Sequence, residues 1–392
     1  MSSDFIPYGR QTITQGDIDS VIEVLRSPFI TQGPAIENFE FSLSDVLGAP
    51  HTVAVSSATA ALHLACLALD LGPSDWVWTS PITFVASSNC ALYCGAKIDF
   101  VDIDRSTGLI SIDSLERKLA FAKAANKLPK AVIPVHLAGS PCDMESIKKL
   151  ADIYKFFVIE DASHAIGSSY RSSPVGSCQF SDMAVFSFHP VKIVTTGEGG
   201  AVTTRDSQIA SKLKALRTHG IIKDQSSFIY PAAGPWSYEQ QFLGYNYRMT
   251  DIQAALGISQ LQRLTNIVAE RNSIRQRYVR ELSEMPIRIL LNAPHSVSSV
   301  HLVILDLLRS NADYHRQVFC KLRELGIGVQ LHYSPVHLQP YYRNLGFKPG
   351  DFPNAEDYAI NAISLPVYPG LTSESQSRVI YSIISCIEGC SS

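Results

Sequence analysis

The sequence predicts an α/β protein in which a large domain, built on a mostly parallel seven-stranded sheet, is followed by a smaller α+β domain. Its 392 residues are enough for two or three domains. From about residue 47 to residue 204, short apolar runs alternate with stretches of helical period. This alternation indicates strands joined by right-handed helical crossovers. Several runs are apolar at every position, as expected of parallel strands that are covered on both faces.

The large domain is predicted from its apolar runs and from the amphipathic stretches between them. The candidate strands are 52–55, 76–79, 97–101, 131–135, 156–160, 183–186 and 201–204. Helical periodicity predicts helices at 60–69, 112–124 and 144–154. Together with the N-terminal segment, these elements are expected to form a domain of residues 1–255.

The pattern changes after Asp251 and predicts the second domain, residues 256–392. A long helical pattern runs from residue 252 to about residue 285. After it we expect a strand at 300–307, a helix at 314–325, a strand at 328–332 and a closing helix at 373–387.

Composition excludes several classes of protein. The chain has 33 basic and 36 acidic residues, a formal net charge of −3, and an apolar content of 46%, so it is neither disordered nor suited to nucleic acid or an anionic membrane surface. No run approaches the roughly 20 apolar residues of a membrane helix, and the N-terminus lacks the pattern of a secretory signal. The eight cysteines include no C-x-x-C pair. We therefore expect a cytoplasmic protein without a metal site.

The most informative stretch is FSFHPVKIVTTGEGG, residues 186–200. Lys192 lies there among apolar neighbours and precedes a glycine-rich turn at 197–200. Burial lowers the pKa of a lysine, and the neutral amine can form a Schiff base with an aldehyde. The alternative is a surface lysine before a hairpin, and this segment alone leaves both interpretations open.

A second stretch, FFVIEDASHAIGSSY, places Asp161 at the end of a buried strand. Ligands of open α/β sheets bind at the carboxyl ends of the strands. A carboxylate there can keep a pyridinium nitrogen protonated, as in pyridoxal phosphate enzymes. Asp161 could equally cap a helix. His164 could donate to or accept from a phenolic oxygen, or it could be a structural histidine.

A third stretch, VAVSSATAALHLACLAL, takes a strand directly into a helix through Ser57, Ala58 and Thr59. Small residues let backbone amides approach an anion, and a helix N-terminus favours negative charge. These residues are therefore a candidate phosphate site. The alternative is an ordinary helix cap.

Taken in chain order, from the small residues at 57–59 through Asp161 to Lys192, the three stretches resemble the fold-type I pyridoxal-phosphate aminotransferases of nucleotide-linked keto sugars, the DegT/DnrJ/EryC1/StrS group. The motifs EDASHA, SFHPVKIVTTGEGG and GYNYRMTDIQAALG carry the resemblance, which extends from about Ile6 to Glu388. It implies pyridoxal 5′-phosphate as cofactor. It also implies Lys192 as the lysine that binds the cofactor and shuttles protons, and Asp161 as the partner of the ring nitrogen.

The resemblance also implies the remaining cofactor contacts. His164 stands where the group usually has glutamine beside the phenolic oxygen, and Ala58–Thr59 stands where it has Gly-Thr. Ser187 is implied to touch the phosphate and Phe84 to stack on the ring. Asn246 matches a residue that reaches the cofactor of the neighbouring subunit, which implies a homodimer with a shared active site.

The sequence looks most like the pseudaminic acid branch of this group. That branch transfers the amino group of L-glutamate to C4 of UDP-2-acetamido-2,6-dideoxy-β-L-arabino-hex-4-ulose, giving UDP-4-amino-4,6-dideoxy-N-acetyl-β-L-altrosamine. The positions that match its sugar site are Tyr8, Pro28, Phe29, Ile30, Thr31, His189, Gln330, Leu331, His332 and Tyr333.

Other functions stay open at this point. Perosamine-type and bacillosamine-type 3- or 4-aminotransferases share the same core motifs. Sugar dehydratases of the group carry histidine in place of the lysine, whereas Lys192 is in register here. A non-catalytic regulatory protein that binds the cofactor is a further alternative. No G-x-G-x-x-G follows the first strand, which argues against a dinucleotide-binding domain.

Overall fold

The computed structural model describes residues 5–308 and 311–390, and its centre is a seven-stranded sheet of order β1-β9-β8-β5-β4-β2-β3. Only β9 runs antiparallel to its neighbours, and the other pairs are parallel. The predicted fold class is thus confirmed. The strands of this sheet are β1 His51–Val55, β2 Trp76–Thr79, β3 Lys97–Phe100, β4 Ala131–Ile133, β5 Phe157–Asp161, β8 Met183–Ser187 and β9 Gly200–Thr204.

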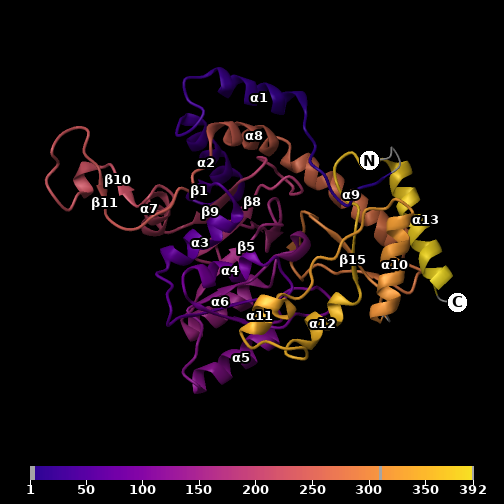
Figure 1. Cartoon of the computed structure of the whole chain (residues 1–392). Helices are drawn as coiled ribbons and strands as arrows, with labels where there is room; N and C mark the ends of the chain where they lie inside the picture. The colour runs from indigo at the N-terminus through magenta and orange to yellow at the C-terminus, as the bar shows by residue number, and fades with distance from the viewer. Residues whose placement is uncertain (1–4, 309–310, 391–392) are drawn as a thin grey trace.

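Helices pack against this sheet, among them α2, α3 and α6, and the helices α10 and α13 lie further from it (Figure 1). No helix within the two described ranges is long and apolar enough to cross a membrane. The α-helices are α1 Gln15–Arg26, α2 Pro34–Leu47, α3 Ala58–Ala68, α4 Ala86–Tyr93, α5 Ile112–Ala124, α6 Met144–Tyr154, α7 Ser207–Leu216, α8 Asp251–Leu261, α9 Leu264–Glu281, α10 Ala312–Glu324, α11 Pro340–Asn344, α12 Pro353–Ala359 and α13 Ser373–Cys390.

A second, antiparallel sheet of order β12-β14-β15 lies beside α10 and α13 (Figure 1). Its strands are β12 Arg288–Ile289, β14 Val303–Asp306 and β15 Ala362–Leu365. Ile6 packs into the same apolar cluster as α9, α10 and α13, while Tyr342 and Tyr358 pack with the large sheet. Since packing crosses residue 255 in both directions, the division of the chain at that residue stays a prediction.

Three expected elements differ in the structure. The helical pattern of 252–285 is two helices, because the chain turns at Gln262–Arg263 between α8 and α9. The predicted strand 328–332 makes only an isolated bridge, from Gln330 to Ser364. The strand expected at 300–307 begins at Val303, because His301 and Leu302 donate their amides to the carbonyl of Ala138 instead of to a strand.

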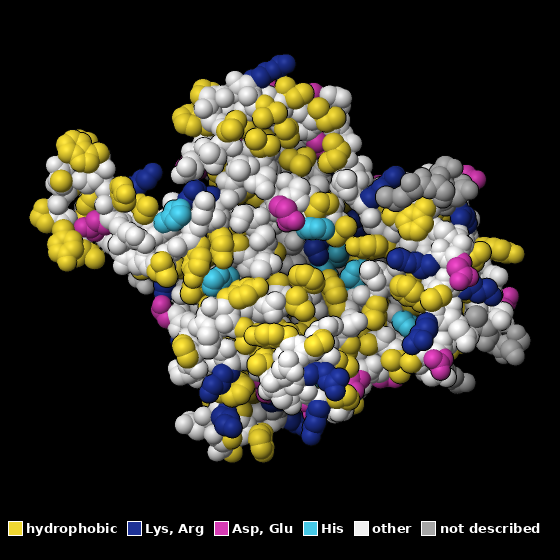
Figure 2. Space-filling view, in the orientation of Figure 1, with side chains coloured by type: hydrophobic (Ala, Val, Ile, Leu, Met, Phe, Trp, Pro, Cys, Tyr) yellow, Lys and Arg dark blue, Asp and Glu magenta, His cyan; other side chains and the backbone are white. Residues whose placement is uncertain are grey.

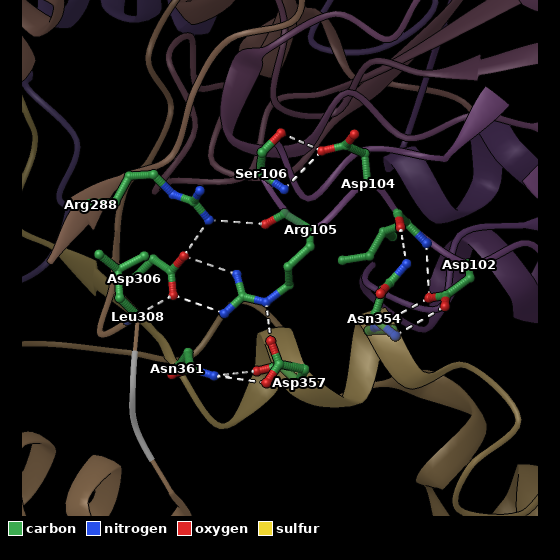
Figure 3. A network of polar contacts seen from close by, with 12 residues as sticks. Asp102, Asp104, Arg105, Ser106, Arg288, Asp306, Leu308, Asn354, Asp357 and Asn361 are labelled. Atoms are coloured by element: carbon green, nitrogen blue, oxygen red, sulfur yellow. Dashed lines mark hydrogen bonds and ion pairs between the residues drawn. The ribbon is translucent and has the colours of Figure 1, made fainter. Parts of the chain in front are cut away.

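A polar network joins the small sheet to the loop after β3 and to α12 (Figure 3). Arg105, from the loop after β3, donates to both carboxylate oxygens of Asp306 on β14, at 2.8 and 3.0 Å. Arg288 on β12 donates to the same carboxylate at 2.6 Å, and Asp357 on α12 pairs with Arg105. Asp306 is 1% exposed. This network therefore holds one buried carboxylate between two guanidinium groups.

An arm of residues 221–243 leaves the body of the protein and carries the short strands β10 Ile221–Ile222 and β11 Glu239–Gln240 (Figure 1). Large apolar side chains on it are exposed, and Figure 2 shows hydrophobic groups gathered on this projection. They are Ile229, Tyr230, Trp236, Tyr238 and Leu243. The remaining short strands, β6 Ser169–Tyr170, β7 Ser173–Pro174 and β13 Ser296–Val297, form a separate small sheet.

Candidate active site

A cavity of about 420 Å³ lies where β5 and β8 end and α3 begins. This is the carboxyl edge of the parallel strands, where open sheets bind ligands. Figure 2 shows histidine side chains near the middle of this face of the molecule. The predicted residues that line the cavity are Tyr8, Ser57, Ala58, Thr59, Phe84, Asp161, His164, Ser187, His189, Lys192, His332 and Tyr333.

Asp161 is the last residue of β5 and is 5% exposed. The hydroxyl of Ser87 donates to its Oδ2 at 2.6 Å, and the amide of Ser163 donates to its Oδ1 at 3.1 Å. Two donors thus fix the plane of the carboxylate. A fixed, buried carboxylate can bind the protonated nitrogen of a heteroaromatic ring.

Lys192 follows β8, and its backbone amide donates to the carbonyl of His189. Burial lowers the pKa of its amine to about 8, although the negative charge of Asp161 opposes this shift. About a tenth of the amine is therefore neutral at pH 7. Such an amine can attack an aldehyde and can then carry a proton.

The N-terminus of α3 faces the same cavity. Ser57 caps the helix by accepting the amide of Ala60 at 3.1 Å, and Ala58 and Thr59 line the cavity. The amides of a first turn have no partner within their helix, which makes this end suited to an anion. A Cβ on Gly200 would lie 2.5 Å from the carbonyl carbon of Ser57, so the backbone of β9 approaches this turn as only glycine allows.

Uncharged histidines form the opposite wall. The amide of Ala138 donates to Nδ1 of His164, and Nε2 of His164 lies 3.1 Å from the hydroxyl of Tyr333. The ring of His301 is centred 4.3 Å from that of His164. Burial and the charge of Lys192 hold the pKa values of His164 and His301 well below the usual value for histidine.

The predicted sugar contacts, together with the predicted cofactor contacts Phe84 and Asn246, divide into those that line the cavity and those that do not. Tyr8 and His332 lie together, with ring centres 5.3 Å apart, and Nδ1 of His332 is 2.9 Å from the hydroxyl of Ser364. Burial, aided by Lys192, lowers the pKa of His332 to about 4. Phe84, which is 59% exposed, offers a free aromatic face with its centre 6.3 Å from that of Tyr333.

The second group lies outside this cavity. It consists of Pro28, Phe29, Ile30, Thr31, Asn246, Gln330 and Leu331. Thr31 forms a bridge with Thr250, and Asn246 forms one with Thr218 at the base of the arm. The 28–31 turn and the side chain of Asn246 are both exposed. The structure thus places the 28–31 turn beside Thr250, and neither this turn nor Asn246 lines the cavity of its own chain.

Several residues of the site were not predicted from the sequence, among them Ser163, whose amide donates to Asp161. Ser87 holds Asp161, Glu198 lines the cavity next to the glycine-rich turn, and His301 lines it beside His164. Glu198 could have been found, since it lies within the motif GEGG. Ser87 and His301 carry no local signal, because they reach the site from α4 and from the segment before β14.

These residues fit pyridoxal phosphate. The start of α3 suits its phosphate, Asp161 its ring nitrogen, Lys192 its aldehyde and Phe84 its ring face. Fold and site together define a pyridoxal-phosphate-dependent enzyme.

Comparison with known proteins identifies the family. Residues 11–384 match the model of the DegT/DnrJ/EryC1/StrS aminotransferase family, and the chain belongs to this family. It is therefore a sugar aminotransferase, and its cofactor is pyridoxal 5′-phosphate.

Relatives match along the whole length of the chain. The uncharacterized protein MJ1066 of Methanocaldococcus jannaschii is 39% identical over 97% of both chains. The spore coat polysaccharide biosynthesis protein SpsC of Bacillus subtilis is 37% identical over 98% of both chains. Among solved structures, the PLP form of the putative sugar aminotransferase Spr1654 from Streptococcus pneumoniae has a TM-score of 0.89 at 31% identity, covering 98% of this chain and 99% of its own. Helicobacter pylori PseC, an aminotransferase of pseudaminic acid biosynthesis, has a TM-score of 0.88 at 31% identity, covering 98% of this chain and 100% of its own.

Proposed function

We propose that this enzyme transfers the amino group of L-glutamate to C4 of a UDP-linked 4-keto-6-deoxy-N-acetylhexosamine. The proposed substrate is UDP-2-acetamido-2,6-dideoxy-β-L-arabino-hex-4-ulose, and the product is UDP-4-amino-4,6-dideoxy-N-acetyl-β-L-altrosamine, a step toward pseudaminic acid. The observation that carries the reaction is the meeting of Lys192 and Asp161 in one cavity. Similarity to PseC supports the substrate.

The residues of the cavity have distinct roles in this proposal. The cofactor's ring, when bound, supplies an electron sink for the charge left on a carbon that loses a proton. Asp161, fixed by Ser87, keeps the ring nitrogen protonated. Lys192 takes the proton from the α-carbon of glutamate and delivers a proton to C4 of the sugar. Ser57, Ala58, Thr59 and Ser187 hold the phosphate.

A histidine-rich rim suits a sugar acceptor. Tyr8, His189 and His332 line the same cavity and offer donors and acceptors to sugar hydroxyls and to a diphosphate. Because the low pKa of His332 keeps its ring uncharged at neutral pH, it can accept or donate according to the hydroxyl that it meets.

We further propose a homodimer with a shared active site. Asn246 and the 28–31 turn are exposed and lie outside their own cavity, as expected of residues that serve the cavity of a second copy. The exposed apolar residues of the arm, including Tyr230 and Trp236, are suited to burial against that copy. Cys66, Cys90, Cys142 and Cys178 are buried and form no disulfide, which suits a reducing compartment, so we propose a cytoplasmic location.

A second acceptor sugar is favoured by a different observation. SpsC, named for spore coat polysaccharide biosynthesis, is 37% identical, whereas PseC is 31% identical. Another UDP- or GDP-linked keto sugar is therefore the alternative acceptor, with the same cofactor chemistry.

An absorption titration tests both halves of the proposal. We expect L-glutamate to convert the cofactor band of the holoenzyme to that of the pyridoxamine form, while L-aspartate serves as the matched control donor. Adding the proposed keto sugar to the converted enzyme should restore the band. Its C5 epimer should restore the band more slowly. A band that glutamate does not change would contradict the amino donor, and faster restoration by the epimer or by a GDP-linked sugar would contradict the acceptor.

A further inference from the structure

The hydrogen bonds of His164 have a defined direction. Its Nδ1 accepts the backbone amide of Ala138, so this nitrogen carries a lone pair and not a proton. Because burial keeps the ring neutral, its single proton is on Nε2. Nε2 lies 3.1 Å from the hydroxyl oxygen of Tyr333. His164 therefore donates and Tyr333 accepts.

This direction determines what the hydroxyl of Tyr333 can do. Its oxygen accepts from His164, so its own proton points to another acceptor. No acceptor for that proton is found among the residues that the structure describes, and Tyr333 lines the cavity. Burial and the charge of Asp161 raise the pKa of Tyr333 far above the usual value for tyrosine, so the hydroxyl keeps its proton at neutral pH. Tyr333 is thus a neutral donor with an unsatisfied proton in the cavity.

The connectivity of a pyridoxal ring indicates the acceptor. The ring nitrogen is assigned to Asp161, the aldehyde carbon to Lys192 and the phosphate to the start of α3. The phenolic oxygen is the remaining polar substituent, and it is adjacent to the aldehyde carbon and on the side away from the phosphate. His164 cannot donate to this oxygen while Ala138 and Tyr333 occupy both of its nitrogens.

We propose that Tyr333 donates its hydroxyl proton to the phenolic oxygen of the cofactor, and that His164 is the positioning residue that orients Tyr333. This inference rests on the cofactor placement in the proposed function and deepens it. The role that the sequence assigns to His164 is here carried by a residue from the other side of the site, 169 positions along the chain.

The test is the pH midpoint of the cofactor's absorption band in the holoenzyme. Without a donor, the phenolic oxygen holds more negative charge and binds the proton of the neighbouring lysine-linked nitrogen more tightly. Since one hydrogen bond to a charged group corresponds to about one to two pH units, Tyr333→Phe should raise the midpoint by about one unit. Tyr381→Phe removes an exposed phenol that does not line the cavity, and should leave the midpoint unchanged.

A double-mutant cycle on His164 and Tyr333 shows whether His164 acts by orienting Tyr333 or by contacting the cofactor itself. His164→Leu should raise the midpoint in the wild-type background but add nothing to Tyr333→Phe. His164→Gln, which retains a donor, should restore most of the wild-type midpoint. Additive shifts would overturn the relay and show that His164 contacts the cofactor itself.

Two further outcomes distinguish failure of the hydrogen bond proposed for Tyr333 from failure of the proposed aminotransferase function. If Tyr333→Phe leaves both the midpoint and the affinity for pyridoxal phosphate unchanged but raises KM for the keto sugar, then Tyr333 contacts the sugar and the inference is wrong while the aminotransferase stands. If wild-type protein shows no glutamate-dependent change of the band, the proposed function fails first. Circular dichroism of each variant, compared with wild type, confirms that the midpoint is read on folded protein.

Discussion

The buried polar groups at the junction of the two sheets and those in the cavity differ in whether their atoms have hydrogen-bond partners. At the junction of the two sheets, the carboxylate of Asp306 accepts from both Arg105 and Arg288, and both of its oxygens have partners (Figure 3). In the cavity, Nδ1 of His301 is buried with no partner among residues 5–308 and 311–390, and the amine of Lys192 is held at a lowered pKa. Buried groups that serve stability are paired, because an unpaired one costs free energy. Nε of Arg288 at the junction is also buried without a partner among the described residues, but His301 lines a cavity, where a ligand can complete it.

The largest effect should come from Lys192. Lys192→Ala should lower the rate of the glutamate half-reaction by on the order of 10⁴-fold, because the proton carrier and the covalent link are both lost. Stopped-flow absorbance measures this. The variant should still bind pyridoxal phosphate without a covalent link, through Asp161 and the start of α3. Wild-type turnover in this variant would contradict the assignment of Lys192.

The lowered pKa of Lys192 should be visible as reactivity. Since its pKa is about 8 instead of 10.5, the neutral fraction at pH 7 is on the order of 10²-fold larger than that of an ordinary lysine. Acylation of the apoprotein by a small anhydride, followed by peptide mass spectrometry, should show a rate midpoint near pH 8 at Lys192. Exposed Lys149 is the internal control. A midpoint above pH 10 at Lys192 would show that the cavity does not desolvate it.

Substitutions at the junction of the two sheets, around Asp306, should lower the free energy of unfolding. Arg105→Ala removes one of the two cations on Asp306 and should lower the free energy of unfolding by about 2 kcal/mol, less than the loss of a sole partner. Urea denaturation measures this. Arg280→Ala removes an exposed partner of Glu281 and should change stability by less than about 0.5 kcal/mol. Equal effects of the two variants would mean that burial of Asp306 does not matter.

Substitution of His301 in the cavity should have the smallest effect on the free energy of unfolding, and this effect should be stabilising. His301→Leu removes a buried nitrogen without a partner and should leave the free energy of unfolding unchanged or slightly raise it. Burial lowers the pKa of His301 in the folded wild-type protein, and the facing groups His164, Lys192, Arg271 and His332 lower it further. Below about pH 6.5, the histidine therefore gains a proton in the unfolded chain but not in the folded one. For this reason His301 makes the wild-type protein less stable as the pH falls. The stabilising effect of the substitution should therefore grow from pH 7.5 to pH 5. A variant less stable than wild type at both pH values would show that His301 supports the fold.

Prediction from the sequence succeeded where the signal is local. The strands from 52–55 to 201–204 are short apolar runs, and each is found in the sheet to within about two residues at its ends. Prediction failed for segments 300–302 and 328–332, where the chain is not in a helix or strand as it approaches the site. Segment 328–332 looks like a strand, but it is held by Ile6, Ser364 and Tyr358 as it passes from α10 to Tyr333. His301 lies just before β14 because its amide is donated to Ala138.

The sequence by itself determined the chemistry: a lysine in an apolar run, an acid at a strand end and small residues before a helix are each local patterns, and together they indicate a pyridoxal phosphate site. Only the tertiary structure decided the partners of these groups. Ser87 is 74 positions from Asp161, and Tyr333 is 169 from His164, so no periodicity connects them. Their hydrogen bonds, and hence the direction of each proton, exist because packing brings α4 and the segment that carries Tyr333 against the strand ends.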